Sequence, residues 1–305
     1  MQLIKKIIKY YKNKIKLIFL PILFAYMMFF IEEKVYPDGS IFNGNLNNGI
    51  RDGVGTYSLN NTKFLGLWKD DKPNGIGTME WENNDQYIGN YDGFKREGFG
   101  IYNWNNGKKY IGMFKVGLPH GKGSMTFPSG DKYYGMFKNN KMEGEGKFTF
   151  ADGTEYVGMF KGNIFSGKGT INYYNGAKHV GMWLNGKREG QGIYTDPYGC
   201  EYRGIWKNDK LEGNVTINYD NGDKYVGMYQ NMKREGKGIY ISSNGNEYRG
   251  MWKNNNWHGH GKISWSNGKV YEGEIKNNKF DGHGKMIYPN GSVYEGEWKN
   301  NIFIR

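Results

Sequence analysis

The chain has 305 residues, a formal net charge of +12 and 48 glycines. Its single cysteine, Cys200, excludes a framework of intramolecular disulfides and favours a reducing compartment. The positive charge is spread along the chain among acidic residues and accompanies no known nucleic-acid-binding motif, so nucleic acid is not an expected partner.

Residues 1–31 carry a membrane signal in two parts. In residues 1–16, isoleucines recur at helical spacing while lysines fall largely on the other side, a pattern typical of a basic amphipathic helix on an anionic membrane. Residues 17–31 form an apolar run and are the candidate membrane anchor. Three interpretations stay open: an uncleaved anchor, a cleaved signal peptide, and a soluble apolar helix that caps the rest of the chain.

The apolar run is short for a membrane crossing. Its 15 residues would span only about 22 Å as a helix, against about 30 Å of hydrocarbon. An interfacial or re-entrant helix would leave the rest of the chain in the cytosol, and we expect this arrangement. The alternative is a single crossing with the N-terminus in the cytosol, because lysines precede the run and Glu32-Glu33 follow it.

From residue 36 to residue 305 the chain repeats one unit of 23 residues. An aromatic residue, called position 1 here, is followed by glycine at position 3 and a large apolar residue at position 5, as in Tyr110, Gly112 and Phe114. Glycines recur at positions 12 and 14, as in Gly121 and Gly123. Position 1 is held by Phe42, in a copy one residue shorter, and then by Phe64, Tyr87, Tyr110, Tyr133, Tyr156, His179, Tyr202, Tyr225, Tyr248, Tyr271 and Tyr294.

This spacing predicts a repeat architecture made of β-hairpins. Positions 1, 3 and 5 alternate as one face of a strand, and positions 14, 16 and 18 do the same in a second strand. Polar stretches such as Lys95-Arg96-Glu97-Gly98 are predicted as the loops between the two strands, and dipeptides such as Asn106-Gly107 as tight turns between repeats. Each glycine within a strand leaves room for an aromatic ring.

The predicted fold is therefore all-β: an elongated, twisted, single-layer antiparallel sheet of about eleven hairpins. Its length is on the order of 100 Å, and a hydrophobic N-terminal helix precedes it. Three copies depart from the pattern, since His179 replaces the aromatic residue, Val215 replaces the glycine at position 14, and Asn84 stands where the linking glycine is expected. The branched side chain of Val215 occupies space meant for a ring, which predicts a local weak point.

The recurring Tyr-x-Gly-x-Trp and x-Gly-x-Gly motifs closely resemble the MORN repeat family. The copy Tyr294-Glu295-Gly296-Glu297-Trp298 comes near to a consensus repeat, and the resemblance covers residues 36–305. Relatives of this family often carry a catalytic module beside the array, for which these residues leave no room. The resemblance implies membrane contact, cytoskeletal or cortical assembly, or pairing of arrays, and binding of phosphoinositides has been suggested for relatives.

No catalytic or metal site is predicted, and no cofactor. Strings such as Gly144-Glu145-Gly146-Lys147 superficially resemble phosphate loops, but they lead into strands and not into a helix N-terminus. The histidines His258, His260 and His283 lack a clear third ligand. Acidic residues at position 11 recur in many hairpins, so we expect them to serve the hairpin.

Two columns of side chains are candidate interaction surfaces. Positions 2 and 4 are apolar through the middle of the array and acidic at its end, and a single-layer sheet cannot bury both of its faces. We expect this apolar stripe to bind a partner or a second copy; the alternative is that sheet curvature makes it the core. Partner-surface candidates are Met113, Met136, Met159, Met182, Met228 and Met251. Lysines at position 6 are either a solvated edge or an anionic-surface site: Lys69, Lys115, Lys138, Lys161, Lys207, Lys253 and Lys276.

Three functions remain open. The expected one is a non-enzymatic scaffold that binds protein partners or itself beside a membrane. The second is a tether that binds anionic phospholipid through the lysine column. The third is a regulatory subunit of a separate enzyme.

Overall fold

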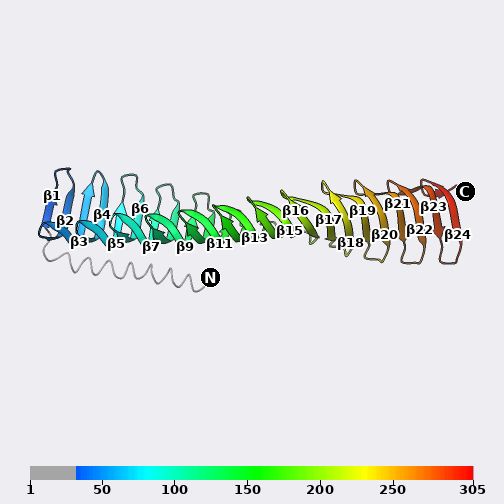
Figure 1. Ribbon diagram of the computed structural model, residues 1–305, viewed down its shortest axis with the longest axis horizontal. Coiled ribbons are helices and arrows are strands. Elements are labelled where there is room, and N and C mark those ends of the chain that lie inside the picture. The colour runs from blue at the N-terminus through cyan, green and yellow to red at the C-terminus, as the bar shows by residue number, and fades with distance from the viewer. Residues whose placement is uncertain (1–31, 305) are drawn as a thin grey trace. The chain divides into compact units, whose positions relative to one another are not determined.

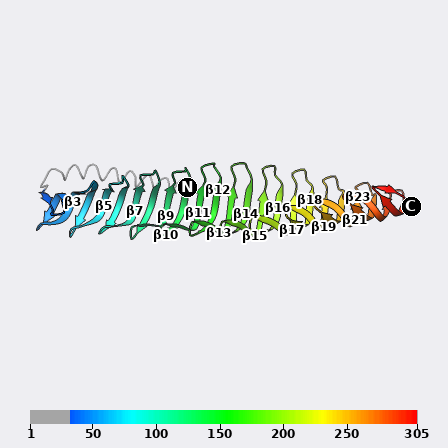
Figure 2. The ribbon, with the colours of Figure 1, turned by 90° about the horizontal axis from the view of Figure 1, so that it is seen from above.

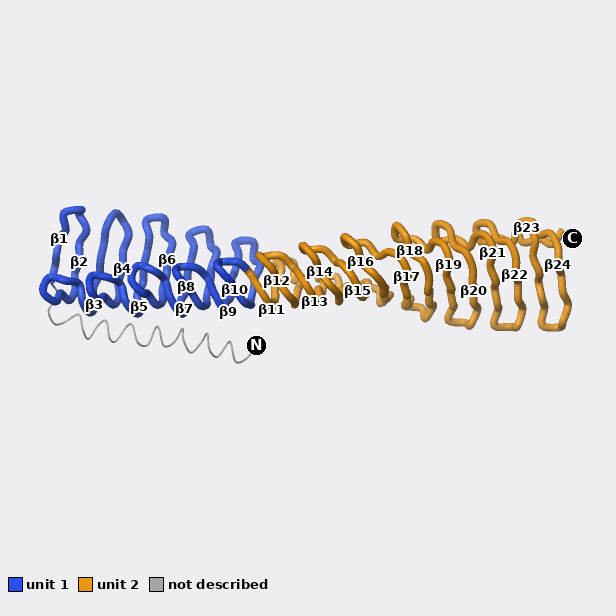
Figure 3. Tube along the Cα trace, in the orientation of Figure 1, with its two compact units in different colours: residues 1–141 blue, residues 142–305 orange. Residues whose placement is uncertain are grey.

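The structure, a computed structural model, describes residues 32–304, which consist of strands and turns without a helix (Figure 1). The strands form an open antiparallel sheet of 25 strands, so the predicted all-β class is confirmed. The chain divides into two compact units, residues 1–141 and 142–305 (Figure 3). The predicted segments at residues 1–16 and 17–31 lie outside the described residues. Within residues 32–304, no helix is long and apolar enough to cross a bilayer.

Strands follow one another in chain order within each unit (Figure 2). The strands of unit 1 are β1 (Glu32–Val35), β2 (Ile41–Asn47), β3 (Ile50–Leu59), β4 (Thr62–Lys69), β5 (Lys72–Glu80), β6 (Gln86–Asp92), β7 (Lys95–Asn103), β8 (Lys109–Lys115), β9 (Leu118–Thr126) and β10 (Lys132–Lys138). Those of unit 2 are β11 (Lys141–Thr149), β12 (Glu155–Lys161), β13 (Ile164–Asn172), β14 (Lys178–Leu184), β15 (Lys187–Thr195), β16 (Glu201–Lys207), β17 (Lys210–Asn218), β18 (Lys224–Gln230), β19 (Lys233–Ile241), β20 (Glu247–Lys253), β21 (Asn256–Ser264), β22 (Val270–Lys276), β23 (Lys279–Ile287), β24 (Val293–Lys299) and β25 (Ile302–Phe303).

Each repeat is a hairpin, as predicted, but its loop is shorter than expected. The segment Lys95-Arg96-Glu97-Gly98, predicted as a loop, opens strand β7. The turn before it is Gly93-Phe94, of which only Gly93 has positive φ (59°), whereas in the equivalent turns both residues have positive φ, such as Asn139 (φ 50°) and Asn140 (φ 65°). This is the turn geometry that matches the twist of a hairpin, and Asn and Gly adopt it most readily. The prediction of a loop was wrong: it was based on the polar composition of this segment, but these charged residues lie in a strand.

Glycine at position 12 is a bulge within the strand. Gly121 has φ 63°, and the register between β8 and β9 shifts between Gly112 and Phe114. A glycine in the left-handed region allows two residues to face one on the neighbouring strand. The glycine at position 12 therefore allows the register shift that follows the short turn. The prediction of a loop did not include this role.

The links between repeats are turns, as predicted, and in the links of sequence Asn-Gly only the glycine has positive φ. In the turn after β7, Gly107 has φ 86° and its N–H donates to the carbonyl of Trp104 at 3.0 Å. The Asn106 side chain instead accepts a hydrogen bond from the N–H of Lys108 at 3.0 Å. Asparagine thus serves as a side-chain acceptor in these turns.

The core lies on the face of positions 1, 3 and 5. Tyr110 is completely buried and its hydroxyl donates to the carbonyl of Met113 at 2.8 Å. Gly112 pairs with Gly100 on one neighbouring strand and with Gly123 on the other, so a row of glycines crosses the sheet beneath the rings. The predicted coupling of glycine and ring is confirmed at this repeat.

Rings of successive repeats meet edge to face. The Tyr110 ring lies 5.1 Å from Phe114 of its own repeat and 5.0 Å from Phe137 of the next. His179 takes the same place between Trp183 at 5.6 Å and Trp206 at 5.0 Å. Such edge-to-face pairs add to the free energy gained from burying the rings. The position-1 rings therefore join each repeat to the next.

Val215 does occupy space meant for a ring. It is buried, and a Cβ placed on Gly204 would contact Val215 and Leu211 at 3.1 and 3.0 Å, whereas the equivalent Cβ on Gly112 would contact Tyr110. The ring of Tyr202 is only half-buried, unlike most other position-1 rings. The displaced ring agrees with the predicted site of a defect, while the predicted loss of stability remains a prediction.

Candidate interaction surfaces

The predicted methionine stripe lies on the solvent side of the strands. In unit 1, Met113 and Met136 are 44% and 41% exposed, and in unit 2 Met159 and Met251 are 39% and 38% exposed. The remaining two, Met182 and Met228, are exposed to the same extent. Sheet curvature therefore does not turn this stripe into the core. We refer to these six residues as the methionine row; its part in binding stays a prediction.

The lysine column lies along the edge of the same face, beside the hairpin turns. All seven predicted lysines are exposed, and none of them takes part in an ion pair among residues 32–304. Lys207 lies directly opposite Lys210 on the neighbouring strand, and Lys276 lies opposite Lys279. Directly opposed like charges are unfavourable. This edge therefore presents more positive charge than the sequence column alone indicated.

The last repeats of unit 2 replace the apolar stripe with charged pairs. Lys262 pairs with Glu272 at 3.3 Å, and Lys285 pairs with Glu295 at 2.9 Å. His260 lies directly opposite Glu274 on the neighbouring strand. Among residues 32–304, no group of three or more His, Cys, Asp or Glu is arranged to hold a metal.

The acidic residues at position 11 serve the hairpins, as predicted. Glu143 accepts a hydrogen bond from the N–H of Gly162 in the next repeat at 2.9 Å, and Glu189 accepts one from Asn208 at 3.0 Å. Bonds from backbone amides to a carboxylate are stronger than bonds between neutral groups. Each such carboxylate fixes the turn of the following repeat.

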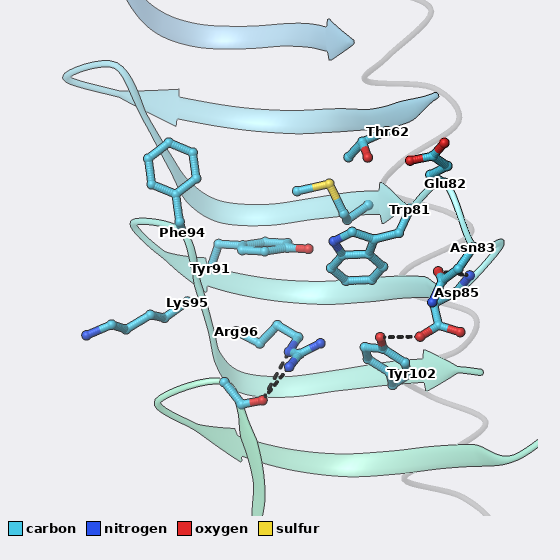
Figure 4. A pocket seen from close by; sticks show the side chains of 12 residues that line it. Thr62, Trp81, Glu82, Asn83, Asp85, Tyr91, Phe94, Lys95, Arg96 and Tyr102 are labelled. Carbon is cyan, nitrogen blue, oxygen red and sulfur yellow. Dashed lines mark hydrogen bonds between the residues drawn. The ribbon is translucent and has the colours of Figure 1, made fainter. Parts of the chain in front are cut away.

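The opposite face of unit 1 contains a cleft of about 870 Å³ (Figure 4). Phe94 and Lys95 line one side, Trp81 and Tyr102 line the other, and the side chains of Tyr91 and Arg96 lie between them. Trp81 and Tyr102 stack at 5.4 Å, and the Arg96 guanidinium lies 4.7 Å from the Tyr102 ring. The cleft therefore combines an aromatic shelf with a cation.

The hydrogen bonds within this cleft leave one donor unused. Tyr102 donates to Asp85 at 2.8 Å, and Asp85 also accepts from the N–H of Asn105 at 2.9 Å. Tyr91 projects into the cleft (Figure 4), and its hydroxyl oxygen is buried without a hydrogen-bond partner. Burial holds the pKa of Tyr91 well above its usual range, so this hydroxyl stays protonated. It can donate a hydrogen bond to a ligand.

Unit 2 contains a smaller cleft of the same kind, of about 580 Å³. Arg188 and Tyr194 hold the places of Arg96 and Tyr102, and the Arg188 guanidinium lies 4.1 Å from the Trp206 ring. The difference lies at Asp209, whose carboxylate pairs with Arg188 at 3.2 Å and fills the place next to the arginine.

The arginines at position 10 were not among the predicted site residues, because this stretch was predicted to be a polar loop. A usable signal was present: Arg51, Arg96, Arg188 and Arg234 each precede the position-5 aromatic residue of the next repeat by 17 or 18 residues. In copies without arginine an apolar residue fills this position, as Phe165 does by stacking on Tyr156 at 3.8 Å.

Buried His179 has no hydrogen-bond partner at either ring nitrogen. Burial lowers the pKa of His179 to about 4. The tyrosines that hold this position in neighbouring repeats instead donate to a carbonyl, as Tyr156 does to Met159 at 3.1 Å. We assign this histidine to the core and not to a site.

Comparison with known proteins agrees with the repeat pattern. The family model described as the MORN repeat matches residues 42–61, 64–86, 87–109, 110–132, 133–155, 156–178, 179–201, 202–224, 225–247, 248–270, 271–293 and 294–303. No curated protein matches the chain.

Solved structures with some similarity include the TCP domain of Drosophila melanogaster SAS-4 in complex with a proline-rich motif of Ana2. It is 12% identical with a TM-score of 0.30, and the alignment covers 58% of this chain and 85% of that one. The TCP10 domain of Danio rerio CPAP is 11% identical with a TM-score of 0.18, covering 88% of this chain and 100% of that one. A streptogramin B lyase is 13% identical with a TM-score of 0.14, covering 90% and 89%. Similarities this low carry no argument about function.

Proposed function

Because the repeat matches extend over residues 42–303, the chain belongs to the MORN repeat family, and we propose that it is a non-enzymatic scaffold. Its strands bury one face in themselves and expose the other, and the methionine row on the exposed face is the observation that carries the proposal. Methionine adapts its shape to different partners, and a row of apolar side chains on a soluble surface is typical of a binding site. The proposed occupant is a protein partner or a second copy of this chain.

We place this scaffold beside a membrane, with the repeats in the cytosol and residues 1–31 attached to the bilayer. The support comes from the lysines and the apolar run in that segment. A single crossing with the N-terminus in the cytosol is the alternative. Protease added to sealed vesicles whose cytosolic face points outward separates the two. Cytosolic repeats should be digested, and repeats on the other side of the membrane should be protected.

The scaffold proposal is tested by changing Met159, Met182 and Met228 together to glutamate in the full chain. The matched control changes the same three residues to leucine, which keeps the surface apolar. Chemical cross-linking in membranes should yield complexes with the wild-type chain and the leucine variant that the glutamate variant loses. An identical set of cross-linked complexes in all three would refute the proposal.

The lysine column favours a second candidate, a tether that binds anionic phospholipid. Opposed lysines such as Lys207 and Lys210 raise the positive charge along one edge, and each basic residue near an anionic membrane contributes about 1 kcal/mol. Residues 32–305 should then float with phosphatidylserine vesicles at low salt and not at high salt. Changing Lys207, Lys253 and Lys276 to glutamine should reduce flotation; unchanged flotation would exclude the column as the lipid site.

A further inference from the structure

The arginines at position 10 differ in whether a carboxylate of the same chain pairs with them. Arg51 pairs with Asp71, with Nε 3.0 Å from the carboxylate, and Arg188 pairs with Asp209 at 3.2 Å. Both aspartates hold position 8 of the following repeat, the second residue of the hairpin turn. In these repeats the chain itself supplies a carboxylate to the arginine.

Arg96 has no such carboxylate, because position 8 of the next repeat is Gly117. Its Nε and Nη2 donate to the Gly117 carbonyl, at 3.1 and 2.6 Å (Figure 4). No ion pair to Arg96 is present among the described residues 32–304. A Cβ placed on Gly117 would lie 3.8 Å from Arg96 Nη2, which is the side from which Asp71 and Asp209 approach their arginines. The place of a carboxylate is therefore open next to a half-buried guanidinium.

Aromatic side chains surround Arg96, and the carboxylates of Glu82 and Asp85 line the cleft on the side of Trp81 and Tyr102 (Figure 4). Tyr91 supplies the buried hydroxyl without a partner. Phe94 is 67% exposed at the rim, in a turn where most other repeats have Asn, Asp or Gly. Trp81 faces it across the cleft (Figure 4). A ligand that fits must therefore join an anionic group to a large apolar one and offer a hydrogen-bond acceptor.

We propose that this cleft binds an extended segment of a partner protein that carries an Asp or Glu beside a large apolar side chain. The carboxylate pairs with Arg96 as Asp71 and Asp209 pair with their arginines. The apolar side chain lies between Phe94 and Trp81, and a backbone carbonyl accepts from Tyr91. The lining residues, from Thr62 to Gly117, come from four successive repeats, so an extended segment covers the cleft better than a small carboxylate does. This site is on the opposite face from the methionine row and is independent of the scaffold proposal.

The aspartates of the other repeats suggest a variant that should block the cleft. Gly117→Asp places a carboxylate beside Arg96 and should occupy the site, and the turn tolerates it because Asp71 and Asp209 hold the same position at φ 64° and 68°, close to the φ of 78° at Gly117. Gly117→Asn is the matched control, with the same shape and no charge. Arg96→Gln removes the cation itself. Circular dichroism of each variant shows whether the fold is kept.

The probes are short synthetic Gly-Ser peptides that carry Asp or Glu at varied distances from Trp, Phe or Leu, with Asn and Gln counterparts. Binding to the full chain in mild detergent is measured by fluorescence anisotropy. Acidic peptides should bind about tenfold more tightly than their amide counterparts, a difference of about 1.4 kcal/mol. Gly117→Asp and Arg96→Gln should abolish that preference, and Gly117→Asn should keep it.

Three results would overturn the proposal. In the first, no peptide of the set binds with a dependence on its carboxylate. In the second, a folded Gly117→Asp variant binds acidic peptides as the wild type does. In the third, acetate or inorganic phosphate displaces the peptides at concentrations equal to theirs, which would identify a simple anion site. If Gly117→Asp fails to fold, Arg96→Gln and the amide peptides still decide the question.

Discussion

The ring of Tyr110 lies across Gly123, and a Cβ on that glycine would stand 2.5 Å from Cε2 of the ring. The two residues share one volume, because the ring of position 1 occupies the space that the glycine of position 14 lacks. At Gly112 the situation differs: a Cβ there would lie 2.6 Å from the Cα of Gly123 and 2.7 Å from the Lys122 carbonyl. Gly123 makes room for the Tyr110 ring. Gly112 makes room for that side chain and also for the backbone of the neighbouring strand.

Gly123→Ala should therefore lower the free energy of unfolding by about 1–3 kcal/mol through overpacking. In a Tyr110→Ala background, which itself costs about 3–5 kcal/mol, the same change should cost much less, because the ring is gone. Gly112→Ala should stay costly in both backgrounds. Urea denaturation of the four-variant cycle checks this, and an equal cost of Gly123→Ala with and without the ring would show that the ring is not the cause.

His179→Tyr should stabilise the protein. A tyrosine there could donate to the Met182 carbonyl, as Tyr225 donates to Met228 at 2.7 Å, and a net gain of about 1 kcal/mol is typical of such a bond. His179→Phe, which supplies the ring without the hydroxyl, is the control and should gain less. Thermal unfolding measures both. A loss of stability in the tyrosine variant would mean that Trp206 has repacked to suit the histidine.

The same histidine predicts acid sensitivity. Burial lowers the pKa of folded His179 from its ordinary value of 6.5 to about 4, so the folded protein binds this proton less readily than the unfolded chain does. The stability that neutral His179 provides is complete above about pH 6.5 and is lost as the pH falls towards 4. Urea midpoints measured from pH 7 to pH 4 should fall more steeply for the wild type than for His179→Phe. Parallel curves would exclude His179 as the source.

Glu143→Ala should loosen the next hairpin turn, because the N–H of Gly162 loses its acceptor. Hydrogen–deuterium exchange of the peptide around Gly162 should become faster, and the free energy of unfolding should fall by about 1 kcal/mol. Glu145→Ala, on the exposed face of the same strand, is the matched control and should leave the exchange rate unchanged. Equal acceleration in both variants would indicate a general effect of lost charge.

The repeated pattern made the fold and its two faces predictable. Aromatic residues and glycines share one period, so Tyr110, Gly112 and Gly123 could be placed on one face without knowledge of any contact. The row from Met113 to Met251 followed as the opposite face, because side chains alternate along a strand.

The cleft could not be predicted in the same way. Lys95-Arg96-Glu97-Gly98 reads as a loop because its charged side chains are unusual in a strand, and the bulge at Gly98 is not visible in the pattern. The neighbour of Arg96 is Gly117, 21 residues further on, and this pairing depends on the register between two repeats. The open place beside Arg96 exists because Gly117 has no side chain, and no sequence motif indicates this.

The most direct test of the division into a core face and a free face is circular dichroism on heating of the Met159→Glu, Met182→Glu, Met228→Glu variant. Exposed substitutions cost at most about 0.5 kcal/mol each, so we predict a full β-sheet spectrum and a Tm within about 5 °C of the wild type. If these methionines were core residues, three buried carboxylates would unfold the repeats around them. Loss of the β-sheet signal or of the cooperative transition would contradict the account.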